Sequence, residues 1–180
     1  SAQQRLGLHM TVCQAVQHAH QKGIIHRDLK PSNILVTLAD GQPVVKVIDF
    51  GVSKALNQRL TERTLFTAYG QMIGTPQYMS PEQASGHSRN ATPRSDVYSM
   101  GVILYEMLVG WPPFRGDGVF ETVRMQVADS PLAPRDARSD LSVPPMLEGV
   151  VLRCLEKRPE DRFESAAHLE RVLAAVAAQL

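Results

Sequence analysis

Three polar side chains flank two short apolar runs and are placed to act together. Asn33 directly precedes the run 34–36, and Asp49 directly follows the run 44–48. If the runs pair antiparallel, Asn33 and Asp49 lie at the same end of a hairpin, where an oxygen of each can reach one magnesium ion, which takes hard oxygen ligands. Asp28 lies shortly before Asn33 on the same loop. The sequence therefore predicts that a proton acceptor and two metal ligands converge on one edge.

A β-hairpin is the element expected to position these groups. Both runs are rich in β-branched residues and they flank Asp40-Gly41, a dipeptide that favours a tight reversal. Helices are expected on either side of the hairpin. Residues 3–21 carry apolar side chains at helical spacing. Ser95 is expected to cap a helix whose interior, 97–109, is apolar almost all round, as in a buried central helix.

The rest of the chain is expected to be helical with long surface segments. Helices are predicted at 119–128, 145–156 and 164–180. The stretch 129–145, rich in Pro, Asp and Ser, is typical of a surface loop. The long polar stretch 52–94 is of the kind that is usually functional or disordered. A chain of 180 residues is long enough for one sizeable core, so we expect a single, mainly α-helical α+β domain.

Composition argues against several classes of protein. A net charge of +1 gives no general reason to expect nucleic acid or an anionic membrane as a partner. No segment approaches the roughly 18 apolar residues of a membrane span, and no signal peptide opens the chain. The two cysteines, Cys13 and Cys154, lie in apolar helical patterns and are expected to be buried thiols. A cytoplasmic location is therefore expected.

Five motifs, in chain order, resemble those of protein kinases. They are HRDLKPSN at 26–33, DFG at 49–51, IGTPQYMSPE at 73–82, SDVYSMG at 95–101 and RPEDRF at 158–163. By this resemblance the chain is identified as a member of the Ser/Thr protein kinase family, similar to bacterial members. The resemblance implies the large (C-terminal) lobe of a kinase domain over 1–180, with a catalytic loop at 26–33, an activation segment at 49–82 and a central helix at about 95–109.

The resemblance also implies a role for each polar group in transfer of the ATP γ-phosphoryl to protein Ser or Thr hydroxyls. Asp28 would be the base that orients the substrate hydroxyl, and Lys30 would neutralise charge on the transferred phosphoryl. A lysine at this place is the Ser/Thr pattern. Thr75 would bridge Asp28 and Lys30 beside the phosphoacceptor. Asn33 and Asp49 would bind Mg²⁺.

Several further residues are expected to support this machinery. Leu35 would form the floor under adenine. Asp96 would anchor the backbone of the catalytic loop, and Glu82 would form a structural ion pair with Arg162. His26 is expected to be a packed residue and not a base. The residues expected to serve structure are His26, Phe50, Glu82, Asp96 and Arg162.

Arg27, between His26 and Asp28, implies control by phosphorylation of the activation segment. A phosphate forms bidentate bonds with an arginine and can order a mobile loop. Our hypothesis is that Thr64 or Thr67 is the site, although the threonine cluster could simply be a solvated loop. Alanine at both positions is expected to lower the activity of the complete kinase in a phosphotransfer assay. Unchanged activity would contradict the hypothesis.

The small lobe that grips ATP is expected to be missing from this chain. There is no glycine-rich phosphate loop, and all five lysines lie within or after the first helix. The chain alone is therefore expected to be inactive, with the small lobe and Ser/Thr-bearing proteins as partners. Two alternatives remain: a non-catalytic, pseudokinase-like scaffold lobe, which usually shows decay of the catalytic positions, and a small-molecule phosphotransferase, which would lack the 74–82 segment.

Overall fold

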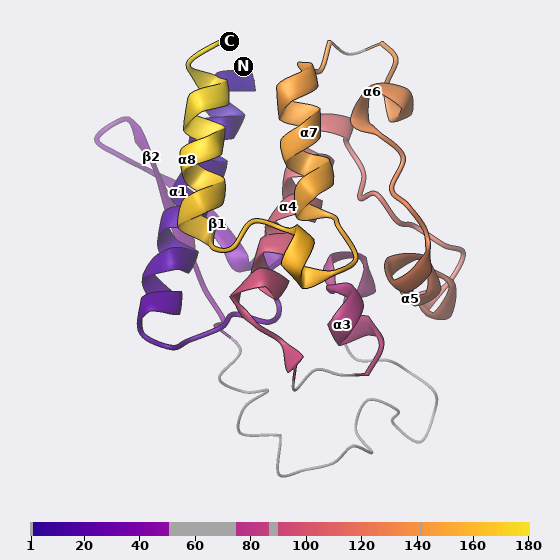
Figure 1. Ribbon diagram of the computed structural model, residues 1–180. Helices are drawn as coiled ribbons and strands as arrows, with labels where there is room; N and C mark the ends of the chain where they lie inside the picture. The colour runs from indigo at the N-terminus through magenta and orange to yellow at the C-terminus, as the bar shows by residue number, and fades with distance from the viewer. Residues whose placement is uncertain (1, 51–74, 87–89, 141) are drawn as a thin grey trace.

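The computed structural model describes residues 2–50, 75–86, 90–140 and 142–180 of the chain. Two strands, β1 (Ile34–Ala39) and β2 (Gln42–Val47), stand among helices (Figure 1). The helices are α1 (Ala2–Gln21), α3 (Pro81–Ala84), α4 (Pro93–Val109), α5 (Val119–Ala128), α6 (Pro134–Ala137), α7 (Pro145–Cys154) and α8 (Ala166–Ala177), with 3-10 turns η1 (Pro31–Asn33), η3 (Pro76–Tyr78) and η5 (Pro159–Asp161). The predicted mainly helical α+β fold is confirmed.

The hairpin forms as the sequence predicts. Strands β1 and β2 pair antiparallel, with Ile34 opposite Val47. Asp40 and Gly41 both have positive φ, at 51° and 75°, as a two-residue turn of the type that matches strand twist requires. The backbone N–H of Ile48 donates to the carbonyl of Asn33 at 2.9 Å, so the ends of the hairpin are tied together.

The central helix α4 begins at Pro93, two residues earlier than predicted. Thr92, not Ser95, is its N-cap: the Thr92 hydroxyl accepts a hydrogen bond from the N–H of Arg94. Ser95 lies inside the helix, and its hydroxyl accepts a hydrogen bond from the backbone N–H of Thr92 at 3.0 Å. Both residues are of the capping type, and the reciprocal arrangement is a capping box. Proline is favourable at the first helical position because a backbone N–H there has no partner within the helix, so its absence costs no hydrogen bond.

The hydrophobic core lies around α4, between α1, α7 and α8. In Figure 1, α8 runs beside α1, and α7 covers α4. Much of α4 is fully buried, which fits a helix that is apolar almost all round. The largest buried apolar side chains of the described residues are Tyr98, Tyr105, Phe114, Phe163, Leu6, Leu29, Met100, Leu104, Leu147, Leu155 and Leu169.

The surface stretch expected at 129–145 contains one short helix, α6, that the sequence did not predict. Pro134 stands at its first position, and Ala133 precedes it with extended backbone. Four residues are too few to show a helical period, which explains the difference. In the described part of the chain, none of the helices combines the length and apolar character needed to cross a membrane.

The two cysteines are buried free thiols. Cys13 lies on α1 and Cys154 at the end of α7, and neither is exposed. Burial raises the pKa of both thiols well above the ordinary value. Since the thiolate is the reactive form, both are expected to be inert in the folded protein.

A close approach of α4 and α7 yields a first prediction of stability. A Cβ atom added at Gly101 would overlap the Cβ of Cys154. Gly101→Ala is therefore expected to destabilise the protein by about 1–3 kcal/mol, the range for overpacking a core. Gly149 on α7 has nothing within 4 Å of such a Cβ, so Gly149→Ala is the control and should stabilise by a few tenths to about 1 kcal/mol. Urea denaturation measures both, and equal stability of the two variants would contradict the close approach.

Lys157 ties the end of α5 to the η5 region. Its Nζ donates to the carbonyls of Gln126, at 2.7 Å, and Met125, at 3.3 Å, and lies 4.1 Å from the centre of the Phe114 ring. A cation suits the last carbonyls of a helix. Burial of the amine lowers the pKa of Lys157 to about 8.

The lowered pKa of Lys157 predicts how stability depends on pH. Between the folded pKa of about 8 and the ordinary lysine pKa of 10.5, the unfolded chain holds a proton that the folded chain has lost. The free energy of unfolding therefore rises with pH in this window, and this contribution is lost as the pH falls through 8. Its size is reduced by solvent screening because the amine is only half buried.

The comparison with Lys157→Met isolates this effect. Urea denaturation at several pH values from about 7 to about 10.5 should show wild type gaining stability relative to the variant. Lys22→Met, at an exposed position, should keep a constant difference from wild type. A constant difference for Lys157→Met as well would show that the amine is not perturbed.

Candidate active site

The loop 26–33 holds an acid, a lysine and an amide in direct contact. Lys30 Nζ lies 3.1 Å from Asp28 Oδ2. The Asn33 side chain donates from Nδ2 to the backbone carbonyl of Asp28 at 2.9 Å. The side chains of Asp28 and Lys30 are about a quarter exposed, at 26% and 21%, so a substrate can reach them, whereas Asn33 is buried. The structure thus brings together three of the residues that the sequence singled out.

A buried carboxylate on α4 fixes the backbone of this loop. Asp96 Oδ2 accepts from the N–H of His26 at 2.8 Å, and Oδ1 accepts from the N–H of Arg27 at 2.9 Å. Oδ2 also lies 2.7 Å from His20 Nε2. Asp96 stands in the first turn of α4, where the helix dipole favours a negative charge. The loop is therefore held to a largely buried helix.

Arg27 adopts a backbone conformation that is rare outside glycine. Its φ is +65°, and its two backbone groups are both bound: the N–H to Asp96 and the carbonyl to Gln83 Nε2, at 2.7 Å. Such a conformation persists where surrounding contacts impose it. The Nε of its guanidinium is buried and has no hydrogen-bond partner among the described residues.

His26 links the loop to the end of β2. It is fully buried, and its Nε2 lies 2.9 Å from the carbonyl of Ile48, so Nε2 carries the proton. Nδ1 accepts from the N–H of Asp28 at 3.3 Å. The ring also lies 4.7 Å from that of Phe50, centre to centre. Both nitrogens are engaged in structural bonds, an arrangement that supports the reading of His26 as a packed residue.

The groups expected to bind magnesium fit that ion in chemistry. Since the Nδ2 of Asn33 is committed to Asp28, the amide oxygen faces away from that bond and is the group that can meet a cation. Asp49 is exposed and follows β2 with a φ of +57°. Within the described residues there is no cluster of three His, Cys, Asp or Glu side chains. A cation held here by one amide and one acid needs further oxygens, and magnesium commonly takes these from phosphates and water.

The segment that follows Thr75 is tied to α4. Ser99 Oγ donates to the carbonyl of Tyr78 at 2.7 Å. The Tyr78 hydroxyl donates to Glu106 Oε2 at 2.6 Å. Burial, together with this bond to Glu106, raises the pKa of Tyr78. Thr75 itself is half-buried at the start of η3, and its expected bridge between Asp28 and Lys30 stays a prediction.

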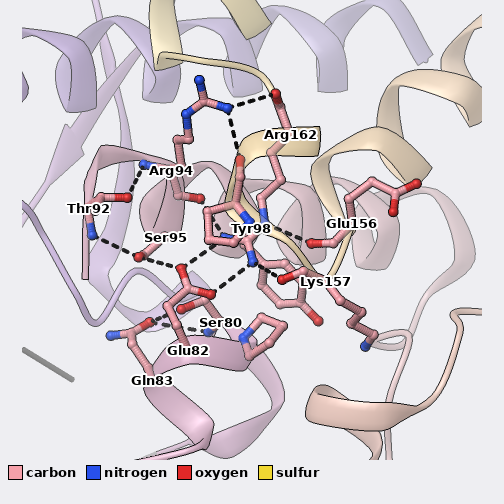
Figure 2. Close-up of polar contacts among 12 residues, drawn as sticks. Ser80, Glu82, Gln83, Thr92, Arg94, Ser95, Tyr98, Glu156, Lys157 and Arg162 are labelled. Carbon is pink, nitrogen blue, oxygen red and sulfur yellow. Dashed lines mark hydrogen bonds and ion pairs between the residues drawn. The ribbon is translucent and has the colours of Figure 1, made fainter. Parts of the chain in front are cut away.

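Glu82 and Arg162 form a bidentate ion pair between α3 and the end of η5 (Figure 2). Arg162 Nη1 donates to Oε1 and Nη2 to Oε2, both at 2.9 Å, and Ser95 Oγ donates to Oε1 at 2.6 Å. Burial would raise the pKa of Glu82, but the hydrogen bonds from Arg162 and Ser95 outweigh it and hold that pKa below its usual value.

The guanidinium of Arg162 is satisfied on every side. Its Nε donates to the carbonyl of Glu156, and its Nη groups donate to the carbonyls of Arg94 and Lys157, at 2.8 to 3.0 Å. The group lies 4.9 Å from the centre of the Tyr98 ring. Arg162 is fully buried, and its bonds join three segments that are distant in sequence: α3, the start of α4, and residues 156–162.

The remaining sequence-predicted residues stand apart from this cluster. Leu35 is 49% exposed on β1, where successive side chains alternate between faces, so it points away from the face of Ile34. Thr64 and Thr67 lie outside the described residues. Sequence reasoning missed His20, which lies against the Asp96 carboxylate on α4, and Gln83, which binds the carbonyl of Arg27 in the loop. The spacing of Ser80 and Gln83 marks a capping box, but it does not reveal the long-range bond to the loop.

Comparison with known proteins bears on this arrangement. The family model for the protein kinase domain matches residues 3–173. Serine/threonine-protein kinase PknB of Mycobacterium leprae is 43% identical over 167 residues, which is 93% of this chain and 25% of the relative. PknB of Mycobacterium tuberculosis H37Rv is 44% identical over 164 residues, or 91% of this chain and 25% of the relative. Probable serine/threonine-protein kinase CE0033 of Corynebacterium efficiens is 42% identical over 171 residues, 94% of this chain and 25% of the relative.

A mainly helical unit with one small hairpin is the architecture of part of a kinase domain. The chain spans about a quarter of the length of the curated relatives it matches. This chain belongs to the protein kinase domain family, among bacterial serine/threonine kinases.

Proposed function

We propose that this chain is the large lobe of a Ser/Thr protein kinase, in which Asp28 orients a protein hydroxyl for attack on the γ-phosphoryl of ATP. The observation that carries the proposal is the contact of Asp28 with Lys30 and Asn33 on a loop whose backbone is fixed by Asp96. Positioning is the main contribution of a protein to phosphoryl transfer, since the reaction requires little covalent chemistry from it.

Each group of the cluster has a distinct part in this proposal. The Asp28 carboxylate accepts the proton of the substrate hydroxyl. Lys30, whose ammonium lies 3.1 Å from Asp28 Oδ2, pairs with the transferred phosphoryl. Asn33 and Asp49 hold Mg²⁺, which when bound neutralises charge on the phosphates. Leu35 offers an exposed apolar face to adenine, and Thr75 lies beside the phosphoacceptor.

Control by phosphorylation is part of the same proposal. The Nε of Arg27 is buried without a partner among the described residues, so a phosphate could pair with this guanidinium. In this proposal the phosphate belongs to Thr64 or Thr67 of the activation segment, residues 49–82. The same phosphate would order the segment around Asp28, which is adjacent to Arg27 in the loop.

The proposed kinase works only with a small lobe. Residues 1–180 supply the large lobe, and the groups that grip the ATP phosphates and adenine from the other side come from the small lobe. The isolated chain is therefore inactive in this proposal. The free, buried thiols of Cys13 and Cys154 are consistent with a reducing, cytoplasmic setting.

Magnesium-dependent ATP binding tests the proposal directly. Calorimetry is performed on this chain and on a form extended N-terminally through the small lobe. Tight binding is expected for the extended form alone, together with transfer of phosphate to a Ser/Thr peptide. Transfer by the isolated chain at a rate near 1–100 per second, typical of kinases, would show that the account of the small lobe is wrong.

A further inference from the structure

One buried glutamine joins helix α5 to the segment Pro76–Tyr78. Gln126 is fully buried, and its Nε2 donates to the carbonyls of Pro76, at 3.1 Å, and Gln77, at 2.5 Å. Its Oε1 accepts from the hydroxyl of Tyr98 on α4. Both N–H groups and the oxygen of the amide are therefore used, and all three bonds are long-range.

Three successive carbonyls are held by side chains in this way. Gln126 binds those of Pro76 and Gln77, and Ser99 on α4 binds that of Tyr78. A backbone with three successive carbonyls engaged cannot shift against α4 and α5 without breaking these bonds. Thr75 directly precedes this segment. Its position is therefore set partly by α5, a helix remote from it in sequence.

Helix α5 is itself fixed at the same residue. The Lys157 ammonium donates to the backbone carbonyl of Gln126 at 2.7 Å, so side chain and main chain of Gln126 are bound at once. The titratable groups around this amide include the Tyr98 hydroxyl, whose pKa is raised by burial, and Lys157, with Arg162 beyond the Tyr98 ring. The carboxylates of Glu82 and Asp129 act on Tyr98 and Lys157, and each is paired with an arginine, Glu82 with Arg162 and Asp129 with Arg124.

We propose that Gln126 is a positioning residue for the peptide substrate. By fixing the carbonyls of Pro76 and Gln77, it sets the shape of the surface beside Thr75 on which the residues around the phosphoacceptor lie. The inference rests on the proposed function, because only in a protein kinase is this segment the shelf for a peptide. It assigns α5 a part in peptide binding and none in ATP binding.

The test uses Gln126→Glu and Gln126→Met in the complete kinase domain. Both replacements keep the length of the side chain. At about pH 8, Gln126→Glu replaces the donating NH₂ group by a carboxylate oxygen, which cannot donate to the two carbonyls. We expect the KM for a Ser/Thr peptide to rise about tenfold or more, since unpaired buried polar groups are costly. The KM for ATP should stay within about twofold. Gln126→Met should raise the peptide KM at every pH.

The pH profile separates positioning from general damage to the fold. Burial beside carbonyls raises the pKa of a carboxyl group, and once protonated that group again donates a hydrogen bond. The peptide KM of Gln126→Glu should therefore recover relative to wild type as the pH falls toward about 6, and that of Gln126→Met should not. Val127→Ala, at an exposed neighbour on α5, is the control and should leave both KM values unchanged.

Several outcomes would overturn the inference. They are a peptide KM like that of wild type in both variants, an equal rise in the KM for ATP, or no recovery of Gln126→Glu at low pH. If wild type phosphorylates no peptide, the proposed function fails and the peptide role with it. Hydrogen exchange of the amides at 77–80 then tests the anchoring alone: faster exchange in Gln126→Met supports the anchor, and unchanged exchange refutes it.

Discussion

Asp28→Asn is expected to lower kcat of the complete kinase domain by about 10²- to 10⁴-fold, or roughly 3 to 5 kcal/mol, the usual contribution of a general base. The replacement is isosteric, and the backbone contacts of the loop with Asp96 and Asn33 do not involve the lost charge. The geometry is therefore retained while the proton acceptor disappears. Steady-state phosphotransfer to a Ser/Thr peptide measures the effect.

Two further measurements show that the loss is chemical. The KM for ATP should change little, and the thermal midpoint should shift only slightly, because the partly exposed pair with Lys30 contributes about 0–1 kcal/mol. Asp40→Asn is the matched control: it makes the same chemical change at the exposed hairpin turn, where asparagine tolerates the positive φ. A kcat of Asp28→Asn within tenfold of wild type would refute the role of the acid.

Arg162→Met is expected to destabilise the protein by about 3–5 kcal/mol, because it leaves the Glu82 carboxylate without its partner in a largely buried site. Urea denaturation measures the loss. Arg158→Met makes the same substitution in the same loop, but the Arg158–Glu160 pair is exposed, at 72% and 57%, and should contribute less than about 1 kcal/mol. Equal losses in the two variants would contradict the buried pair.

The pH dependence adds a second check on this ion pair. Because the pKa of Glu82 is held below its usual value, its contribution is present above the unfolded pKa and is lost as the pH falls through the folded value. The difference between wild type and Arg162→Met should therefore shrink below about pH 4.5. A double replacement, Glu82→Leu with Arg162→Met, should recover part of the loss, since neither charge is then left unpaired.

Local chemistry explains which parts of the fold could be predicted. The hairpin followed from Asp40-Gly41 between two β-branched runs, and α5 was predicted with its observed bounds, 119–128, from its amphipathic pattern. The N-cap of α4 was placed three residues late, at Ser95 instead of Thr92, because both are good caps. Which of the two caps the helix depends on the hydrogen bond that each side chain makes, and residue type alone does not decide it.

The polar groups of the site also divide into those that local sequence marks and those that it does not. Asp28, Asn33 and Asp49 could be predicted as site residues because they stand at fixed places in a loop and at hairpin ends. Gln83 and Gln126 could not, although each binds backbone carbonyls of a functional segment. The carbonyls that they bind lie roughly 50 residues away in sequence, so no local pattern reveals these bonds, although Gln83 also stands in a capping box with Ser80.

The left-handed backbone at Arg27 and Asp49 has a consequence for protein engineering. Glycine adopts these angles, +65° and +57°, at no steric cost, whereas arginine is strained there by about 1–2 kcal/mol and aspartate by less. Glycine at either place would relax the backbone and delete a side chain to which the proposed function assigns phosphate or magnesium. Selection for heat resistance alone would thus favour glycine at these two positions, at the expense of the proposed activity. Libraries of variants of this chain therefore have to be ranked by turnover as well as by melting temperature.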